Sequence, residues 1–314
     1  MEIRSLYESQ QFSTQLLFQL FKRADDLQEH ARQGTIPQTL NGKILAALFY
    51  EPSTRTRMSF ESAMIRLGGN TISTENAAEF TSFAKGESIE DSTRVIGGYV
   101  DIIAMRTKQE GLAKNAADVS YVPVINAGDG RGQHPTQALL DVYTIYRELK
   151  QVNGIHIAMV GDLKNGRTVR SLCYLLGKFE NIKITFVSPN NLRMQDDIKA
   201  YLKKHDVVYE QTNDLNEILS RADAIYITRI QKERMSGQDY ESAKGQFVVG
   251  KDDLDKIKPN AILMHPLPHI EEISLPVSIE ETDRRVAYIR QAANGLYARM
   301  ALLEWALKKG PFKE

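Results

Sequence analysis

The sequence contains a single cysteine among 314 residues, which excludes an internal disulfide and a zinc site built from several cysteines. That residue, Cys173, lies in the apolar stretch RSLCYLLGKF. A thiol in such surroundings is usually buried and unreactive, so we expect Cys173 to pack in a core rather than act as a nucleophile. This sparing use of cysteine fits a reducing compartment such as the cytoplasm.

The sequence also lacks an excess of charge and long apolar segments. Lys plus Arg and Asp plus Glu both total 40, so the formal net charge is zero and a nucleic-acid partner is disfavoured. No apolar run is long enough to cross a bilayer, so we expect no membrane association. The first residues, MEIRSLYESQQF, resemble neither a signal peptide nor a transit peptide. We expect a cytoplasmic location, with an organelle form that has lost its transit peptide as the alternative.

Short apolar runs alternate with amphipathic patterns along most of the chain. KILAALFY at 43–50, DIIAMR at 101–106 and HIAMVGD at 156–162 are typical of buried strands. Residues 13–32 and 135–149 show helical periodicity. Repeated strand–helix units predict an α/β fold of two doubly wound domains, each a mainly parallel sheet flanked by helices.

The length of 314 residues suits two domains of ordinary size. The polar stretch KQVNG at 150–154 separates a predicted helix from a predicted strand, so we place a boundary there. We expect a first domain at 1–149, a second at 150–284, and a C-terminal helix at 285–314 that packs back on the first domain, with interdomain helices joining the two. Ligands bind beyond the C-terminal ends of strands in such sheets, and the cleft between the domains is the default site.

The strongest local signal is the segment Ser53-Thr54-Arg55-Thr56-Arg57, which follows a predicted strand and opens a predicted helix. The first N–H groups of a helix and its positive dipole end attract an anion. Hydroxyl donors and arginine forks suit a phosphate in particular. The alternative is an ordinary helix cap with solvated arginines, but two arginines in one turn favour an anion site.

Further polar residues stand at the predicted C-terminal ends of strands in the first half. Arg106 ends DIIAMR, while His134 and Gln137 follow the glycine-rich turn at 128–132. Taken singly, such residues are usually surface charges or helix caps, but their shared location predicts one convergent site. The turn reads GxGxG and lacks the dinucleotide spacing, so a nicotinamide-dependent dehydrogenase is poorly supported.

The second half repeats this arrangement with two arginines. Arg167 opens a predicted helix after VGD, and Arg229 ends ADAIYITR with Gln231 just beyond it. Two arginines from separate loops suit a ligand with two carboxylates. The alternative is a pair of exposed surface arginines, which is the usual situation for any one arginine.

Several sequence blocks, in order, resemble those of the aspartate/ornithine carbamoyltransferase family: FYEPSTRTRMSFESAM, INAGDGRGQHPTQALLD, VGDLKNGRTVRS, TRIQKER and HPLP. They span residues 49–268, and the flanking helices also match. HPLP at 265–268 points to the aspartate-specific catalytic chains, because ornithine-specific relatives typically carry a cysteine in place of its first proline. The resemblance implies transfer of the carbamoyl group from carbamoyl phosphate to the α-amine of L-aspartate. The products are N-carbamoyl-L-aspartate and phosphate, the committed step of de novo pyrimidine (UMP) biosynthesis.

The resemblance implies a reaction that needs no metal, no cofactor and no covalent intermediate. It also implies that the first domain binds carbamoyl phosphate and the second binds aspartate. Thr56, Arg106 and His134 are expected to donate to the carbonyl oxygen, as an oxyanion hole requires, and Arg55 completes the catalytic set. The implied carbamoyl phosphate site consists of Ser53, Thr54, Arg55, Thr56, Arg106, His134, Gln137 and the backbone carbonyls of Pro266 and Leu267. The implied aspartate site consists of Lys85, Arg167, Arg229 and Gln231.

The resemblance also concerns partners. It implies that a loop carrying Ser82 and Lys85 enters the active site of a neighbouring subunit, which makes a homotrimer with shared sites the smallest competent unit. It further implies that Glu51 pairs with Arg167 and Arg234 when the domains close. A separate regulatory subunit or a multienzyme pathway complex is left open as a partner.

The sequence departs from the family pattern at His269, which follows HPLP where an arginine is usual. A histidine loses its charge near neutral pH and forms no bidentate fork, so aspartate affinity, its pH dependence or a feedback-inhibitor contact could differ from the family pattern.

Two rival functions remain. A carbamoyltransferase for ornithine would need an acidic residue in place of Arg229, and a silent scaffold subunit would have lost some of the site residues.

Overall fold

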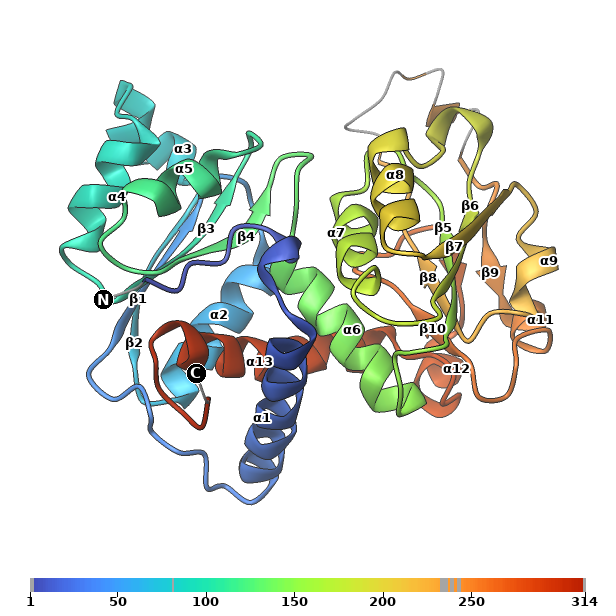
Figure 1. Cartoon of the computed structure of the whole chain (residues 1–314), viewed down its shortest axis with the longest axis horizontal. Helices are drawn as coiled ribbons and strands as arrows, with labels where there is room; N and C mark the ends of the chain where they lie inside the picture. The colour runs from blue at the N-terminus through green and yellow to red at the C-terminus, as the bar shows by residue number, and fades with distance from the viewer. Residues whose placement is uncertain (1–2, 81, 232–236, 238–239, 242–243, 313–314) are drawn as a thin grey trace. The chain divides into compact units, whose positions relative to one another are not determined.

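The computed structural model describes residues 3–80, 82–231, 237, 240–241 and 244–312 (Figure 1). The chain divides into two compact units: unit 1 is Met1–Leu139 with Asn294–Glu314, and unit 2 is Leu140–Ala293. Among the described residues each unit contains one main sheet, and every pair of neighbouring strands is parallel. The predicted α/β fold with two mainly parallel sheets is therefore confirmed. The division falls within helices α6 (Pro135–Leu149) and α13 (Tyr288–Ala306), whereas the sequence placed boundaries at 149 and 284.

The sheet of unit 1 has the strand order β2-β1-β3-β4. Its apolar strand β1 is almost entirely buried, as the run of apolar residues from position 44 to 49 requires. The chain passes from β1 to β2 on one side and then to β3 on the other, so the strand order reverses between β1 and β3. The strands are β1 (Ile44–Phe49), β2 (Asn70–Glu75), β3 (Ile102–Thr107) and β4 (Val124–Asp129).

The helices of unit 1 begin with α1, where the Ser13 side chain accepts a hydrogen bond from the Leu16 N–H at 3.1 Å, as an N-cap does. The buried face of α1 includes Leu17 and Phe21, while Leu16 is half-buried. The helices are α1 (Thr14–Arg32), α2 (Thr54–Arg66), α3 (Ala77–Phe80), α4 (Ile89–Gly97), α5 (Leu112–Val119), and the 3-10 helices η1 (Ser9–Gln11) and η2 (Ser82–Lys85).

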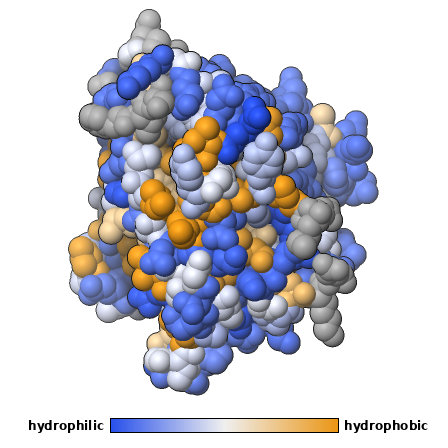
Figure 2. Space-filling model, turned by 90° about the vertical axis from the view of Figure 1, so that its left-hand side faces the viewer, coloured by the Kyte–Doolittle hydropathy of each residue, from blue (hydrophilic) through white to orange (hydrophobic). Residues whose placement is uncertain are grey.

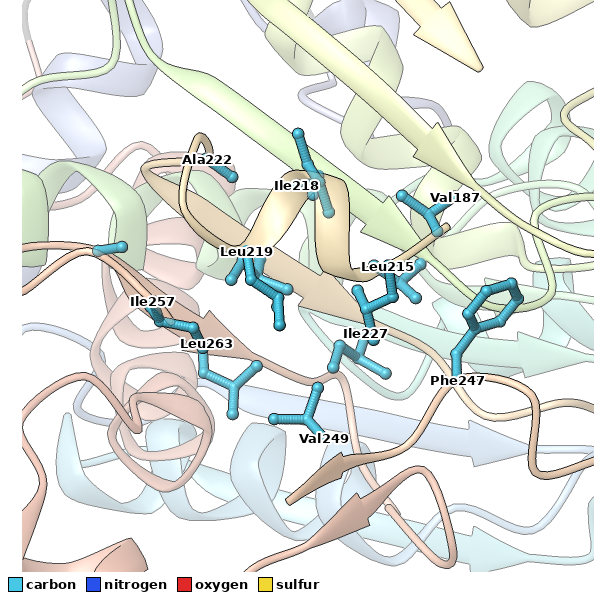
Figure 3. Packing of buried hydrophobic residues seen from close by; sticks show 14 of the residues in the cluster. Val187, Leu215, Ile218, Leu219, Ala222, Ile227, Phe247, Val249, Ile257 and Leu263 are labelled. Carbon is cyan, nitrogen blue, oxygen red and sulfur yellow. The ribbon is translucent and has the colours of Figure 1, made fainter. Parts of the chain in front are cut away.

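The sheet of unit 2 has the order β10-β8-β5-β6-β7, so the chain again winds in both directions from its first strand, and the order reverses between β5 and β8. A separate pair, β9 and β11, is also parallel. Figure 3 shows Leu219, Ile227, Val249 and Leu263 gathered in the apolar cluster that packs against β8. The strands are β5 (His156–Val160), β6 (Lys183–Val187), β7 (Val208–Thr212), β8 (Ala224–Ile227), β9 (Val249–Gly250), β10 (Ile262–Met264) and β11 (Ile273–Ser274).

Helix α7 carries the single cysteine. Cys173 is fully buried, and burial raises the pKa of its thiol well above the ordinary value, so the predicted inert core thiol is confirmed. No helix within the described ranges is both long and apolar enough to cross a bilayer. The further helices of unit 2 are α7 (Arg167–Leu176), η3 (Asn190–Leu192), α8 (Asp196–Lys204), α9 (Asn216–Leu219), α11 (Lys251–Leu254) and α12 (Val277–Thr282).

Candidate active site

The predicted phosphate residues lie where the strand order of unit 1 reverses. Phe49 at the end of β1 is in register with Arg106 of β3, and the Tyr50 N–H donates to the Arg106 carbonyl at 2.8 Å. The Arg106 guanidinium donates through Nε to Glu51 at 3.0 Å and through Nη1 to the Ser53 hydroxyl at 3.0 Å. The structure thereby brings three predicted site residues into direct contact at the carboxyl edge of the sheet, which is where doubly wound folds bind ligands.

The first turn of α2 follows Ser53, which contacts Arg106 at the carboxyl edge of the sheet. Ser53 is the N-cap residue with an extended backbone, yet its hydroxyl accepts from Arg106 instead of from a helix N–H group. Thr54 and Arg55 are exposed, whereas Thr56 is buried with 7% of its surface accessible. The N-terminal end of α2 therefore presents backbone N–H groups, a hydroxyl and a guanidinium in one turn, which is the donor set of a phosphate site.

The second arginine of this turn has a different role. Arg57 donates to Glu61, four residues along α2, at 3.1 Å, and to Glu75 at the end of β2 at 3.1 Å. A third contact, to the Ser73 hydroxyl, measures 3.4 Å. Arg57 thus ties α2 to β2, and its charge is shared with two carboxylates. Of the two arginines in the motif, only Arg55 is left as a candidate phosphate ligand.

The glycine-rich turn after β4 is organised by Asp129. Its carboxylate accepts from the Gln133 N–H at 2.6 Å and from the Gly111 N–H at 3.0 Å. Gly130 has a φ of +45°, and a Cβ there would lie 2.6 Å from the Lys108 carbonyl oxygen, so only glycine fits. The sequence predicted no dinucleotide site in this turn, and the contacts give it a structural role: they fold the chain tightly before α6.

His134 and Gln137 enter at the start of α6. His134 immediately precedes the helix and is 4% accessible, and Gln137 in its first turn is 8% accessible. The Thr136 hydroxyl lies 3.4 Å from His134 Nδ1. Because α6 follows β4, which pairs with β3, both residues stand at the same edge of the sheet as Arg106.

The predicted aspartate residues of unit 2 lie where its strand order reverses. Val160 of β5 is in register with Ile227 of β8, and the chain continues from these ends to Arg167 and Arg229. Arg167, the first residue of α7, is 7% accessible, while Arg229 and Gln231 are half-buried. The two arginines therefore follow the paired strands that flank the reversal, where doubly wound sheets bind ligands.

The loop before α7 has its own internal support. Asp162 is fully buried, and its carboxylate accepts from the backbone N–H of Asn165 at 3.0 Å and from its side-chain amide at 3.2 Å. Gly161 has a φ of +111°, and a Cβ there would lie 2.1 Å from the Thr228 carbonyl oxygen. The loop carrying Arg167 and the strand end carrying Arg229 are thus in backbone contact.

The HPLP segment follows β10, the neighbour of β8. His265 is 2% accessible, and its backbone N–H donates to the Gln291 side chain at 2.9 Å. The Leu267 N–H donates to His265 Nδ1 at 2.8 Å, and Leu267 adopts a positive φ of 57°. Sequence reasoning did not select Gln291, Glu272 or His265 as site residues, because their roles depend on contacts between separate segments.

The remaining predicted residues are placed as follows. Ser82 begins η2 and Lys85 ends it, with Lys85 exposed. Arg234 lies outside the described residues. His269, the departure from the family pattern, has Nε2 3.7 Å from Glu280 Oε1, and its ring packs on Tyr288 with centroids 5.2 Å apart.

Comparison with known proteins shows to which family this fold belongs. A model of the carbamoyl-P binding domain of aspartate/ornithine carbamoyltransferases matches residues 4–147, and a model of the Asp/Orn binding domain matches residues 153–306. The chain belongs to the aspartate/ornithine carbamoyltransferase family. It is accordingly an enzyme that transfers carbamoyl groups, as the sequence predicted.

Within this family, the chain is similar to several proteins named aspartate carbamoyltransferase or aspartate transcarbamoylase. The chloroplastic enzyme of Arabidopsis thaliana is 51% identical over 308 residues, 98% of this chain and 78% of that protein. The catalytic subunit of M. jannaschii aspartate transcarbamoylase has a TM-score of 0.89 and 42% identity, with 98% of both chains covered. The Trypanosoma cruzi enzyme, solved with carbamoyl phosphate and aspartate, has a TM-score of 0.88 and 36% identity, with 96% and 95% covered. The predicted aspartate carbamoyltransferase is thus confirmed over the ornithine-specific alternative.

Proposed function

We propose that carbamoyl phosphate binds at the carboxyl edge of the unit 1 sheet, with its phosphate on the first turn of α2. The observation that carries this proposal is the contact of Arg106 with Ser53 and Glu51, each at 3.0 Å. Ser53, Thr54, Arg55 and Thr56 supply the remaining phosphate donors. The T. cruzi relative, whose solved complex contains carbamoyl phosphate and aspartate, supports the choice of substrates.

Catalysis in this proposal rests on donors aimed at the carbonyl oxygen of carbamoyl phosphate. That oxygen becomes more negative as the amine attacks, so fixed donors stabilise the transition state more than the ground state. Thr56, Arg106 and His134 are the proposed donors. We propose that the Thr136 hydroxyl, 3.4 Å from His134 Nδ1, donates to that nitrogen, so that the neutral ring carries its proton on Nε2 and donates it to the substrate.

The carbamoyl NH₂ group needs acceptors instead of donors. We propose that the Gln137 side chain and the backbone carbonyls of Pro266 and Leu267 fill that role. Arg167, Arg229 and Gln231 hold the two carboxylates of aspartate, and Lys85 contributes from a neighbouring subunit. With these groups in place, the α-amine nitrogen attacks the carbonyl carbon, the bond to the phosphate oxygen breaks, and the departing phosphate accepts the amine proton. Such alignment is worth up to about 7–11 kcal/mol of the barrier.

The acceptor is tested by assaying purified protein with carbamoyl phosphate and either aspartate or ornithine, following the ureido product by colour reaction. Product with aspartate alone is the expected result, because Arg229 and Gln231 suit a second carboxylate and not an ammonium group. Product with ornithine alone would keep the phosphate site and overturn the aspartate site. Absence of product with both, in protein that still binds carbamoyl phosphate, would favour a scaffold subunit.

Glu51 is proposed to change partners during catalysis. Its carboxylate lies 3.0 Å from Arg106 Nε, and on closure it is proposed to pair with Arg167 and Arg234. We expect Glu51→Gln to raise the KM for aspartate and lower kcat by about tenfold or more, since a charge-assisted pair of this kind contributes about 1.5–3 kcal/mol. Steady-state kinetics at saturating carbamoyl phosphate measures both parameters. Unchanged values would remove Glu51 from the closure mechanism.

The proposed homotrimer is supported by the surface of unit 1. Met58 and Ile65 of α2 and Ile72 of the edge strand β2 are each more than half exposed, at 56%, 57% and 55%. Figure 2 shows hydrophobic residues gathered among hydrophilic ones on the face that is turned toward the viewer. Exposed apolar side chains on adjoining elements are typical of subunit interfaces. Light scattering is expected to give about three times the chain mass.

A cytoplasmic location is proposed from the cysteine chemistry. The single thiol, Cys173, is buried and inert, so the fold needs no oxidising compartment. The Arabidopsis relative bears a chloroplastic name, so an organelle is the alternative. Fractionation of source cells with an antibody against this chain separates the two locations.

A further inference from the structure

The backbone of the HPLP segment is tied to the imidazole of its own first residue. The Leu267 N–H donates to His265 Nδ1 at 2.8 Å. A backbone N–H can only donate, so Nδ1 must be an unprotonated acceptor, and the neutral ring carries its proton on Nε2. Leu267 has a φ of +57°, a left-handed conformation that is unfavourable for a leucine and persists only where surrounding contacts hold it.

Glu272 faces the opposite side of that ring. Its Oε1 lies 2.9 Å from His265 Nε2, and both side chains are almost fully buried, at 1% and 7% accessible. Oε1 also accepts from the Ile270 N–H at 3.2 Å. Burial raises the pKa of Glu272, but hydrogen bonds from His265 and from backbone N–H groups outweigh that effect, so the pKa lies below its ordinary value. A carboxylate at this position favours the ring tautomer with the proton on Nε2.

The other end of the segment is anchored separately. The His265 N–H donates to Gln291 Oε1 at 2.9 Å, and Gln291 Nε2 donates to Asp141 at 2.6 Å. The Tyr226 hydroxyl donates to the second oxygen of Asp141 at 2.8 Å. These groups are buried, and they fix the chain before Pro266. The imidazole of His265 fixes the chain after Pro266, so the two peptide carbonyls of the segment are held from both sides.

We propose that His265 and Glu272 form a positioning pair that sets the direction of the Pro266 and Leu267 carbonyls toward the carbamoyl NH₂ group. The inference rests on the proposed function, which assigns these two carbonyls to the substrate. Neither side chain touches the reacting atoms. Glu272 fixes the ring tautomer, the ring fixes the Leu267 peptide, and the peptide presents the acceptors that distinguish an amide from other acyl groups.

A matched pair of substitutions separates this role from packing. In His265→Asn, the amide oxygen takes a place close to that of Nδ1 and accepts from the N–H two residues on, as in an Asx turn. In His265→Gln, the amide lies near the position of Nε2 and no such acceptor remains. We expect His265→Gln to weaken carbamoyl phosphate binding by about three- to tenfold, corresponding to one hydrogen bond, and His265→Asn to weaken it less.

Acetyl phosphate is the discriminating probe, because it keeps the phosphate and the carbonyl but has a methyl group in place of NH₂. Its affinity is measured as inhibition against carbamoyl phosphate. We expect His265→Gln to bind acetyl phosphate as the wild type does, so that the preference for carbamoyl phosphate falls by the same three- to tenfold, about one hydrogen bond. Equal weakening of both ligands would indicate general distortion and overturn the positioning role.

The preference of the wild type for carbamoyl phosphate over acetyl phosphate tests the proposed function separately from this inference. A wild type that binds both ligands equally overturns the assignment of the two carbonyls to the substrate, and the positioning pair with it. A wild type that prefers carbamoyl phosphate, with a His265→Gln variant that keeps the full preference, overturns only the pair. Glu272→Gln gives a second variant where His265→Gln fails to fold. It retains the side-chain shape and removes the charge, so the preference is expected to fall in the same direction and an unchanged preference contradicts the role of Glu272.

Discussion

Gly161 shows at the residue scale how a backbone contact places a functional side chain. A Cβ at this position would lie 2.1 Å from the Thr228 carbonyl oxygen, which no real contact permits. In Gly161→Ala the strand end after β8 must move, and Arg229 is the next residue along it. We expect the KM for aspartate to rise and the free energy of unfolding to fall by about 1–3 kcal/mol. Steady-state kinetics and denaturant unfolding measure the two effects.

Gly154 provides the matched control for this prediction. It also has a positive φ, +75°, but a Cβ there would meet no atom within 4 Å. Gly154→Ala should therefore lose about 1–2 kcal/mol of stability through backbone strain alone, with an unchanged KM for aspartate. An aspartate KM in Gly161→Ala equal to that of Gly154→Ala would show that the contact with Thr228 does not place Arg229.

The sequence predicted those site residues whose type and strand-end position were visible locally. Ser53 and Arg106 are examples, and the structure places them 3.0 Å apart. The supporting residues carry no such signal. Asp129 resembles any turn aspartate, and Glu272 resembles any surface glutamate until the chain folds and brings it 2.9 Å from His265. Their roles depend on contacts between segments, which local patterns of residues do not encode.

At the scale of secondary-structure elements, an ion pair fixes the turn between α12 and α13. Arg285 Nη2 lies 2.6 Å from Asp283, and Arg285 Nη1 donates to the carbonyls of Leu254 and Ile257 beside α11. The hydrogen bond from Arg285 lowers the pKa of Asp283 below its ordinary value. The folded state therefore binds the Asp283 proton more weakly than the unfolded chain does, and the resulting stability is present above the unfolded pKa of about 3.9.

The predicted consequence is a loss of this stability as the pH falls through the folded pKa of Asp283. Asp283→Asn should be less stable than the wild type by about 1–2 kcal/mol at neutral pH, and the difference should shrink below about pH 4. Denaturant unfolding at several pH values measures it. Glu281→Gln, which neutralises an exposed carboxylate of α12, is the control and should match the wild type throughout. A difference for Asp283→Asn that is constant down to the most acidic pH would contradict the assignment.

Prediction of whole elements succeeded where the hydrophobic period was clear. The helix expected over 135–149 is α6 with the same bounds, and the strand expected near 43–50 is β1. The strand β2 was not predicted, because its sequence NTISTE contains one apolar residue and it lies at the sheet edge with its side chains exposed or half-buried. Edge strands bury too little surface to require an apolar pattern.

At the scale of the whole molecule, the main sheets of the two units share one topological feature, a reversal of the strand order. In unit 1 the strand order reverses between β1 and β3, and in unit 2 between β5 and β8. Each reversal separates the loops that leave the two strands, and the separated loops carry the predicted ligands of one substrate. Arg106 and Ser53 belong to the first reversal, and Arg167 and Arg229 to the second. This topology supports our proposal that the first sheet holds the phosphate and the second sheet holds the aspartate carboxylates.

The proposed homotrimer with shared sites makes a prediction that only mixed oligomers test. His134→Ala removes a donor from a subunit's own site, whereas Lys85→Ala removes a residue supplied to its neighbour, so each variant alone should be nearly inactive. In randomly mixed trimers, a site is complete when an intact His134 meets an intact Lys85 from the next subunit. That combination has a chance of about one quarter at equal mixing, so co-expression should restore about a quarter of the wild-type rate.

The control mixes His134→Ala with Arg106→Ala. Both of these residues are proposed to serve the active site of their own subunit. No mixture of these two variants assembles a complete site, because His134 and Arg106 must come from one chain. Recovery with Lys85→Ala and none with Arg106→Ala would establish that the loop of η2 serves the neighbouring active site. Failure of both mixtures, in trimers shown by mass to contain both chains, would place Lys85 in the active site of its own subunit and leave each subunit with a self-contained site.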